Sequence, residues 1–379
     1  MLKNKIYNYL SKEIIKNFIT ILLTFSAIAW TVRAVNFLDL MIEDGYSASI
    51  YFKYTLLNIS TIATRFVPLA FLISLIISIL KFERQQELLI LWTAGLSKIK
   101  IANIFFLLAL LVTLLQITLG LIINPFSLNK SRSLLRETEI MQINSMLKLN
   151  DFSDAFKGLT FYIDKKNSKG ELLNIFIKDT SGSLSTIAPE AKNSINSTII
   201  ADRGLITNNK LVLFEGIIQT LNTKNEIKNI NFEKTELSIN NFSTRTIKNT
   251  KIQETSSFNL MKCLLGKENS QSLQNCTFGG NKKETIQAML RRIGVPLYIP
   301  LIAVIVSFLL IYKKEKKYNH LKKYIIFLVS FMILIFAEIF LKFTGFSLRN
   351  TAIYFLTPII LFLIFYLFLV KSMISEKKI

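Results

Sequence analysis

Six long apolar stretches separated by polar ones dominate the pattern of the chain. An α-helix needs about 20 residues to cross a hydrocarbon core of about 30 Å. The pattern therefore predicts six membrane-spanning helices, approximately at residues 17–37, 61–80, 101–123, 293–312, 324–341 and 352–370. The first stretch also has a basic leader and contains Ala27-Ile28-Ala29, as a cleaved signal peptide would. Because apolar sequence continues beyond them, we favour a helix that stays in the membrane.

Between the third and fourth stretches the pattern changes to short alternating runs split by Gly, Asn and Asp. Residues 127–149 are typical of a helix, and the runs that follow predict an antiparallel β-sandwich or open roll. Four residues are predicted to point inward, either as core or as the lining of a groove for an acyl chain: Phe161, Ile163, Phe176 and Phe214.

The predicted fold class is therefore a six-helix membrane protein with an inserted, extracytoplasmic, all-β domain. Residues 1–123 hold spans one to three, residues 124–292 hold a linker helix and the β-domain, and residues 293–379 hold spans four to six.

Charge sets the expected orientation. The net charge is +21, and the lysines and arginines gather at the ends of the apolar stretches. By the positive-inside rule, both termini and residues 81–100 lie in the cytoplasm, and the β-domain lies outside it. A nucleic-acid partner is not expected, because no basic face with interleaved aromatic residues is present.

The inventory of reactive side chains is small. With two cysteines and one histidine, neither a Cys/His metal site nor a histidine-based catalytic triad can be assembled, and no cofactor is expected. Cys263 and Cys276 flank a polar loop, and outside the cytoplasm a disulfide between them is favoured. No phosphate-binding G-x-x-x-x-G-K-[ST] loop occurs, so any ATP-driven step needs a separate ATPase subunit.

Ionisable residues within spans are costly and are therefore candidates for function. Counted from the cytoplasmic end, Arg33, Arg65, Glu338 and Lys342 lie roughly 21 to 27 Å along their helices, and Arg291 and Arg292 open the fourth span at a similar level. In one interpretation the arginines reach for the lipid surface while Glu338 and Lys342 form an i,i+4 ion pair. In the other, Arg33, Arg65 and Arg292 bind an anionic, phosphate-bearing ligand.

Residues 82–97 form an unusually polar connection between the second and third spans. A helix is predicted over residues 82–94, with Gly95 ending it and Ser97 capping the next helix. Glu83 and Glu87 would be repelled by an anionic lipid surface, which favours docking to a cytoplasmic protein.

Three segments carry a family resemblance. The sequence "QELLILWTAGLSK" (86–98) resembles the coupling helix of the LptF/LptG lipopolysaccharide export permeases, and "INPFSL" (123–128) and "MLRRIGVPLYIPL" (289–301) are similar to that family's entries into its β-jellyroll and fourth span. The last of these and the Gly-Leu-Ser ending favour the LptF branch.

The resemblance implies both partners and site residues. A cytoplasmic LptB-like ATPase dimer would dock at Glu87, Trp92, Ala94, Gly95, Leu96 and Ser97. An LptG-like permease and an LptC-like subunit would complete the assembly within the membrane lipids. The cargo would be lipopolysaccharide, with its phosphates near Arg33.

Three other functions remain open at this point. A permease that transmits force without moving cargo would keep the coupling helix but not the arginines. A membrane sensor with a periplasmic ligand-binding domain would need a cytoplasmic output domain, for which the inner loops are too short. A membrane enzyme would need a nucleophile with a nearby base, and the pattern contains none.

Overall fold

The fold comes from a computed structural model, which describes residues 2–42, 46–141, 149–156, 158–167, 171–180, 194–207, 210–222, 227–238, 251–265, 282–311 and 316–375. Six segments in these ranges are long and apolar enough to cross a membrane: Lys5–Ile42, Ala48–Arg84, Lys98–Leu135, Lys282–Leu310, Leu321–Leu341 and Leu348–Ser375. The six predicted spans are therefore confirmed, and most are longer than the apolar stretches alone indicated.

The chain divides into two compact units. The helical unit comprises Met1–Asn36, Thr55–Lys130 and Lys251–Ile379, and the sheet unit comprises Phe37–Tyr54 and Ser131–Thr250. The sheet unit is thus narrower in sequence than the predicted 124–292, because residues on both flanks of the sheet belong with the helices.

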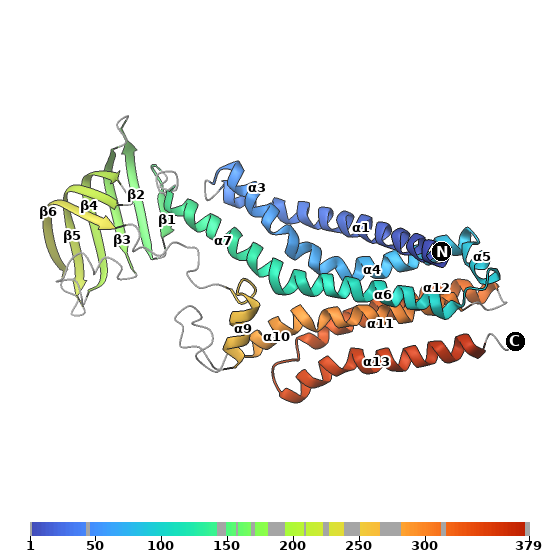
Figure 1. The fold of residues 1–379 in the computed structure, drawn as a ribbon. Helices are drawn as coiled ribbons and strands as arrows, with labels where there is room; N and C mark the ends of the chain where they lie inside the picture. Colours follow the sequence, from blue (N-terminus) through green and yellow to red (C-terminus); the bar gives the residue numbers. More distant parts are fainter. Residues whose placement is uncertain are drawn as a thin grey trace. The chain divides into compact units, whose positions relative to one another are not determined.

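Long helices lie side by side in the helical unit (Figure 1). The long ones are α1 (Leu2–Asn36), α4 (Ile59–Arg84), α6 (Lys98–Thr118), α12 (Lys316–Leu341) and α13 (Leu348–Ser375), and the shorter α11 (Tyr298–Ser307) lies among them. The other described α-helices of the chain are α2 (Asp39–Ile42), α3 (Ala48–Leu57), α5 (Glu87–Thr93), α7 (Asn124–Met141), α9 (Ser257–Leu264) and α10 (Lys282–Ile293). A π-helical turn, η1 (Leu119–Ile123), joins α6 to α7, and the 3₁₀ turns η5 (Val295–Leu297) and η6 (Phe308–Leu310) flank α11.

The fourth span is the centre of the helical unit. Every residue of α11 is buried, and α11 packs in one apolar core with α4 and α6 through large side chains such as Phe71 and Phe105. In contrast, α1, α12 and α13 keep rows of exposed Ile, Leu and Phe. A helix that is apolar all round is typical of a core position, and the exposed apolar rows are what a lipid environment accepts.

The sheet unit contains one antiparallel sheet with strands in chain order (Figure 1). They are β1 (Phe152–Phe156), β2 (Leu159–Lys166), β3 (Leu172–Asp179), β4 (Ser194–Thr207), β5 (Lys210–Asn222) and β6 (Ile227–Ser238). The all-β prediction is confirmed. The described strands do not form the predicted sandwich, since each pairs with its neighbour in sequence and no second sheet is formed among them.

Side-chain alternation gives the sheet two unlike faces. Phe161 and Ile163 of β2 are buried, as predicted, together with Ile175 and Ile177 of β3. Phe176 is not part of this core, because it lies between Ile175 and Ile177 and therefore points to the opposite face. Phe214 is likewise only partly buried, next to the fully buried Leu213, so the inward position predicted for both phenylalanines was wrong.

Candidate functional site

The coupling segment is a short separate helix. α4 ends at Arg84, Gln86 adopts a left-handed conformation with φ of 57°, and α5 begins at Glu87. The single helix predicted over 82–94 is therefore interrupted at Gln85 and Gln86. A left-handed residue other than glycine costs about 1–2 kcal/mol and needs support from its surroundings.

Gly95 ends α5 as predicted. It has φ of +83°, its N–H donates to the Trp92 carbonyl (3.0 Å), and the Leu96 N–H donates to the Leu91 carbonyl (3.0 Å). This pair of hydrogen bonds is the Schellman arrangement, and the buried Leu96 supplies its apolar contact. Ser97 stands at the N-cap position of α6, but its hydroxyl makes no capping hydrogen bond, so only the positional part of that prediction holds.

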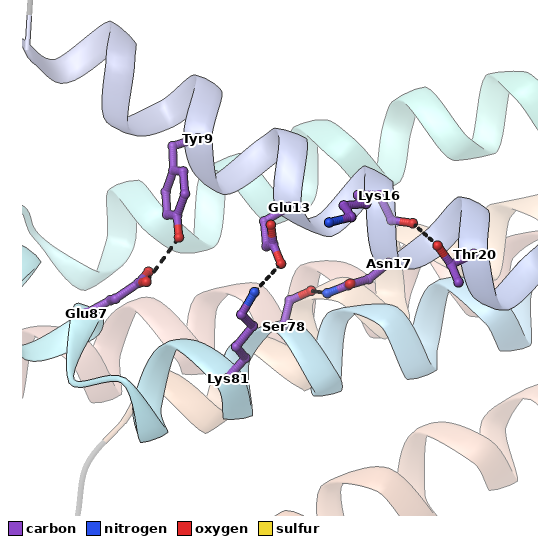
Figure 2. A network of polar contacts seen from close by, with 8 residues as sticks. All are labelled: Tyr9, Glu13, Lys16, Asn17, Thr20, Ser78, Lys81 and Glu87. Carbon is purple, nitrogen blue, oxygen red and sulfur yellow. Dashed lines mark hydrogen bonds and ion pairs between the residues drawn. The ribbon is translucent and has the colours of Figure 1, made fainter.

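Polar contacts join α5 and the end of α4 to α1 (Figure 2). The Tyr9 hydroxyl donates to Glu87 Oε1 (3.0 Å), Lys81 Nζ contacts Glu13 Oε1 (2.5 Å), and Asn17 Nδ2 donates to Ser78 Oγ (2.9 Å). Tyr9, Glu13 and Asn17 are four residues apart and so share one face of α1. None of the three was predicted as a site residue, although their spacing of four is visible in the sequence.

The exposed side of α5 borders a groove of about 310 Å³. Its lining residues come from α1 and α5: Lys5, Ile6, Tyr9, Glu87, Ile90 and Leu91. Ala94 and Gly95 are exposed at the end of the helix, while the indole of Trp92 is half-buried, with Lys98 Nζ 4.4 Å from the ring centre. Exposed apolar side chains around one carboxylate form a surface suited to a protein partner that carries a cation.

Charged residues from four helices gather at the other end of the helical unit. Arg65 of α4 interacts electrostatically with Arg33 of α1, Arg291 of α10 and Glu338 of α12. Arg291 Nη2 lies 3.4 Å from Glu338 Oε2, whereas no hydrogen bond or salt bridge joins Arg65 to another described residue. We call these four residues the arginine cluster.

The predicted ion pair between Glu338 and Lys342 is not formed. α12 ends at Leu341, and the Lys342 N–H donates to the Ile339 carbonyl in a tighter turn. The helical i,i+4 geometry that the pair requires is therefore lost, and Glu338 pairs with Arg291 instead.

Arg292 has a structural position, which argues against its predicted role in phosphate binding. It is 8% exposed, and it donates to Ser257 Oγ (2.6 Å) and to the carbonyls of Ile252 (3.3 Å), Gln253 (3.1 Å) and Thr255 (3.0 Å). A guanidinium whose donors are satisfied inside the protein has little left to offer a ligand. We therefore replace Arg292 by its exposed neighbour Arg291 in the candidate site.

An apolar stripe crosses the second face of the sheet. The cross-strand register aligns Phe152 with Tyr162, Tyr162 with Phe176, Phe176 with Ile200 and Ile200 with Ile217, so the stripe runs from β1 to β5. Phe152 is 64% exposed, and Ile200 and Ile217 are 45% and 39% exposed. A row of this kind offers a surface for apolar chains.

The disulfide stays a prediction. Cys263 lies in α9, and Cys276 lies outside the described residues. Within the part of the chain that the structure describes, no group of three or more His, Cys, Asp and Glu residues could hold a metal ion.

Comparison with protein families identifies the family to which the chain belongs. The family model "Lipopolysaccharide export system permease LptF/LptG" matches residues 8–372. The chain belongs to the LptF/LptG family. The match includes α5, the arginine cluster and the whole sheet, and it does not distinguish LptF from LptG.

A relative extends the comparison. Uncharacterized protein RP871 of Rickettsia prowazekii (strain Madrid E) is 24% identical over 247 residues, which are 64% of this chain and 65% of the relative. The chain thus spans somewhat less than two thirds of this relative. With six apolar helices and this family, it is a multi-pass protein of the inner membrane.

Proposed function

We propose that this LptF/LptG member is the membrane-spanning subunit of an ABC-type exporter that takes lipopolysaccharide from the outer leaflet of the inner membrane. The observation that carries the proposal is the arginine cluster, in which α1, α4, α10 and α12 bring three arginines and one carboxylate together. Guanidinium groups bind phosphate oxygens through paired donors, which favours an anionic ligand. The lipid A phosphates are the chemical groups that fit this site.

The acyl chains of the cargo need an apolar path. In the proposed orientation the sheet lies in the periplasm, because the basic ends of the spans lie together on the other side. The stripe from Phe152 to Ile217 then receives acyl chains as lipid leaves the membrane. A periplasmic LptC-like subunit would continue this apolar surface.

The energy of ATP hydrolysis reaches this chain through α5. A cytoplasmic LptB-like ATPase dimer docks on the groove beside Glu87 and displaces the Tyr9 hydrogen bond. An LptG-like permease pairs with this chain in the membrane. Because α1 is one uninterrupted helix, a movement at Tyr9 is carried to Arg33, 24 residues or about 36 Å away. The ligand is moved only if its contacts differ between the open and closed states, which displacement of α1 relative to α12 provides.

Lipid analysis after purification tests the proposal. The chain and its partners are extracted from native membranes as wild type, with Arg33→Glu plus Arg65→Glu, and with Lys100→Glu as a control at the exposed, coupling end of α6. We expect mass spectrometry to find lipopolysaccharide with the wild type and the control, and at least a tenfold loss in the double variant, since one charge-assisted contact contributes roughly 1.5–3 kcal/mol.

Two outcomes would redirect the interpretation. Absence of lipopolysaccharide from the wild-type complex contradicts the cargo. Equal lipid in all three samples, with the ATPase still bound, favours a permease that transmits force without carrying lipid.

A further inference from the structure

Three exposed phenylalanines of the helical unit each have a lysine ammonium over the ring. The distances from Nζ to the ring centre are 5.9 Å for Lys130 and Phe126, 4.7 Å for Lys262 and Phe258, and 3.5 Å for Lys283 and Phe346. The phenylalanines are 67%, 68% and 66% exposed. Exposing three phenylalanine rings to water costs free energy. The Phe–Lys pairs therefore favour a partner that accepts both an apolar ring and a cation.

The pairs occur at the end of the helical unit away from α5, where α9 lies beside the start of α10 (Figure 1). Phe126 is on α7, Phe258 is on α9, and Phe346 is in the turn between α12 and α13. Three separate parts of the chain thus carry the same combination of side chains at the same end of the unit.

Hydrogen bonds fix the position of α9 along the length of the membrane-spanning helices. Ser257 Oγ donates to the carbonyl of Leu121 (2.7 Å) in the π-helical turn that joins α6 to α7, and Arg292 donates to the same hydroxyl. Leu121 is 20 residues beyond Ile101, where the span was predicted to begin, which is about 30 Å and hence the full thickness of the hydrocarbon core. α9 therefore begins at the boundary between hydrocarbon and headgroups.

The Phe346 pair is held in place as firmly. Gln287 Nε2 donates to the carbonyls of Lys342 (2.9 Å) and Thr344 (3.0 Å), which ties the turn after α12 to α10. Gly345, with φ of +82°, packs so closely on Lys283 that a Cβ atom would lie 2.8 Å from the Lys283 carbonyl oxygen. Lys283 and Phe346 are thus kept adjacent by the backbone.

The side chains of α9 divide between two faces. Leu260 is 1% exposed and faces the protein, while Phe258, Met261 and Leu265 are 68%, 56% and 65% exposed. The helix has a lysine and no acidic residue. An exposed apolar face beside a lysine is typical of a helix that lies in a membrane interface.

We propose that the three Phe–Lys pairs form a collar that seats this end of the protein in the lipid headgroup layer, with α9 lying on the bilayer surface. The rings enter the upper acyl region and the ammonium groups reach the lipid phosphates above them, as long basic side chains do at membrane boundaries. A bilayer is the favoured occupant because the three pairs come from separate parts of the chain at the same end of the helical unit. The collar does not depend on the cargo that the protein carries.

Fluorescence quenching tests the proposal on the full-length chain. The background is Trp30→Phe plus Trp92→Phe, which removes the two tryptophans of the sequence, and Phe258→Trp is then introduced. The protein is reconstituted into phosphatidylcholine–phosphatidylglycerol vesicles with bromine placed either high or low on the acyl chains. The controls are Leu114→Trp, on the exposed face of α6, and Ile227→Trp, on exposed β6.

We expect the high bromine to quench Phe258→Trp more strongly than the low bromine, both positions to quench Leu114→Trp, and neither to quench Ile227→Trp. Lys262→Glu should weaken the quenching of Phe258→Trp in the anionic vesicles. If Phe258→Trp instead behaves like Ile227→Trp, or is shielded from both bromolipid and aqueous acrylamide, α9 does not lie on lipid. Quenching that is unaffected by Lys262→Glu would overturn the role of the lysines.

Discussion

The two ends of the helical unit differ in how their charged side chains are paired. At the α5 end, Glu13 is paired with Lys81, Glu83 with Lys323 (2.8 Å), and Glu87 accepts from Tyr9. At the other end, Arg65 is close to two like charges and one carboxylate, and forms no hydrogen bond with another described residue. Matched charges hold helices in fixed positions, whereas surplus charge of one sign is suited to binding a ligand.

Two arginines sharpen the same contrast. Arg292 and Arg65 both lie at the outer end of the spans, yet Arg292 is buried among four acceptors while Arg65 is exposed. The difference lies in what surrounds each guanidinium: the segment from Ile252 to Ser257 folds over Arg292. Residue type and depth do not separate a structural arginine from a binding one, but the local backbone does.

Arg292→Met should have the largest effect on stability. It removes the donors from three backbone carbonyls and Ser257, and each buried acceptor left unsatisfied costs about 1–3 kcal/mol. We expect a loss of roughly 3 kcal/mol or more, seen as a large drop in the thermal midpoint in detergent. Arg291→Met, on the same helix but exposed, is the matched control and should change the midpoint little. Equal midpoints for the two variants would contradict the structural assignment.

Tyr9→Phe should have a smaller effect, confined to the coupling end. It removes the hydrogen bond to Glu87 and keeps the ring that packs 6.3 Å from Phe82. One net hydrogen bond contributes about 0.5–1.5 kcal/mol. We therefore expect the ATPase to bind a few-fold more tightly, because Glu87 no longer has to give up its hydrogen bond from Tyr9. Surface plasmon resonance with the isolated ATPase measures it. Weaker binding would mean that Tyr9 presents Glu87 rather than holding it back.

The smallest expected effect is a pH dependence of the sheet unit. Hydrogen bonds from Lys210 and Lys234 hold the pKa of Glu236 below its usual value. A carboxylate with a lowered pKa adds stability at neutral pH, and this contribution is lost as the pH falls below about 4.5 through the lowered value. The stability of Glu236→Gln should therefore fall slightly less steeply than that of the wild type between neutral and acidic pH. Circular dichroism measures this difference. A slope identical to the wild type would mean that the pairs are too exposed to matter.

Much of the fold follows from local sequence. The six spans are set by apolar length, and the end of α5 by Gly95, whose left-handed φ is cheap only for glycine. The break at Gln86 was not predictable in this way, because no Gly or Pro marks it. The local sequence pattern predicted the strands. Assigning Phe176 and Phe214 to one face of the sheet also requires knowing where each lies in the in–out alternation of its strand.

The candidate site was predictable only in part. Depth along the spans indicated Arg33 and Arg65, and the electrostatic contact between them is consistent with that. Choosing Arg291 over Arg292 requires the position of α9, and pairing Glu338 with Arg291 requires the packing of α10 against α12. These are contacts between residues far apart in the chain, which periodicity and spacing do not encode.

The central claim is that the two ends have separate tasks, joined by α1. The most direct test is one purification from native membranes in which both the ATPase and the lipopolysaccharide are quantified, for Glu87→Ala and for Arg65→Glu. The account predicts that Glu87→Ala loses the ATPase and keeps the lipid, and that Arg65→Glu loses lipid and keeps the ATPase. Loss of both from either variant, or of neither from Arg65→Glu, would contradict it.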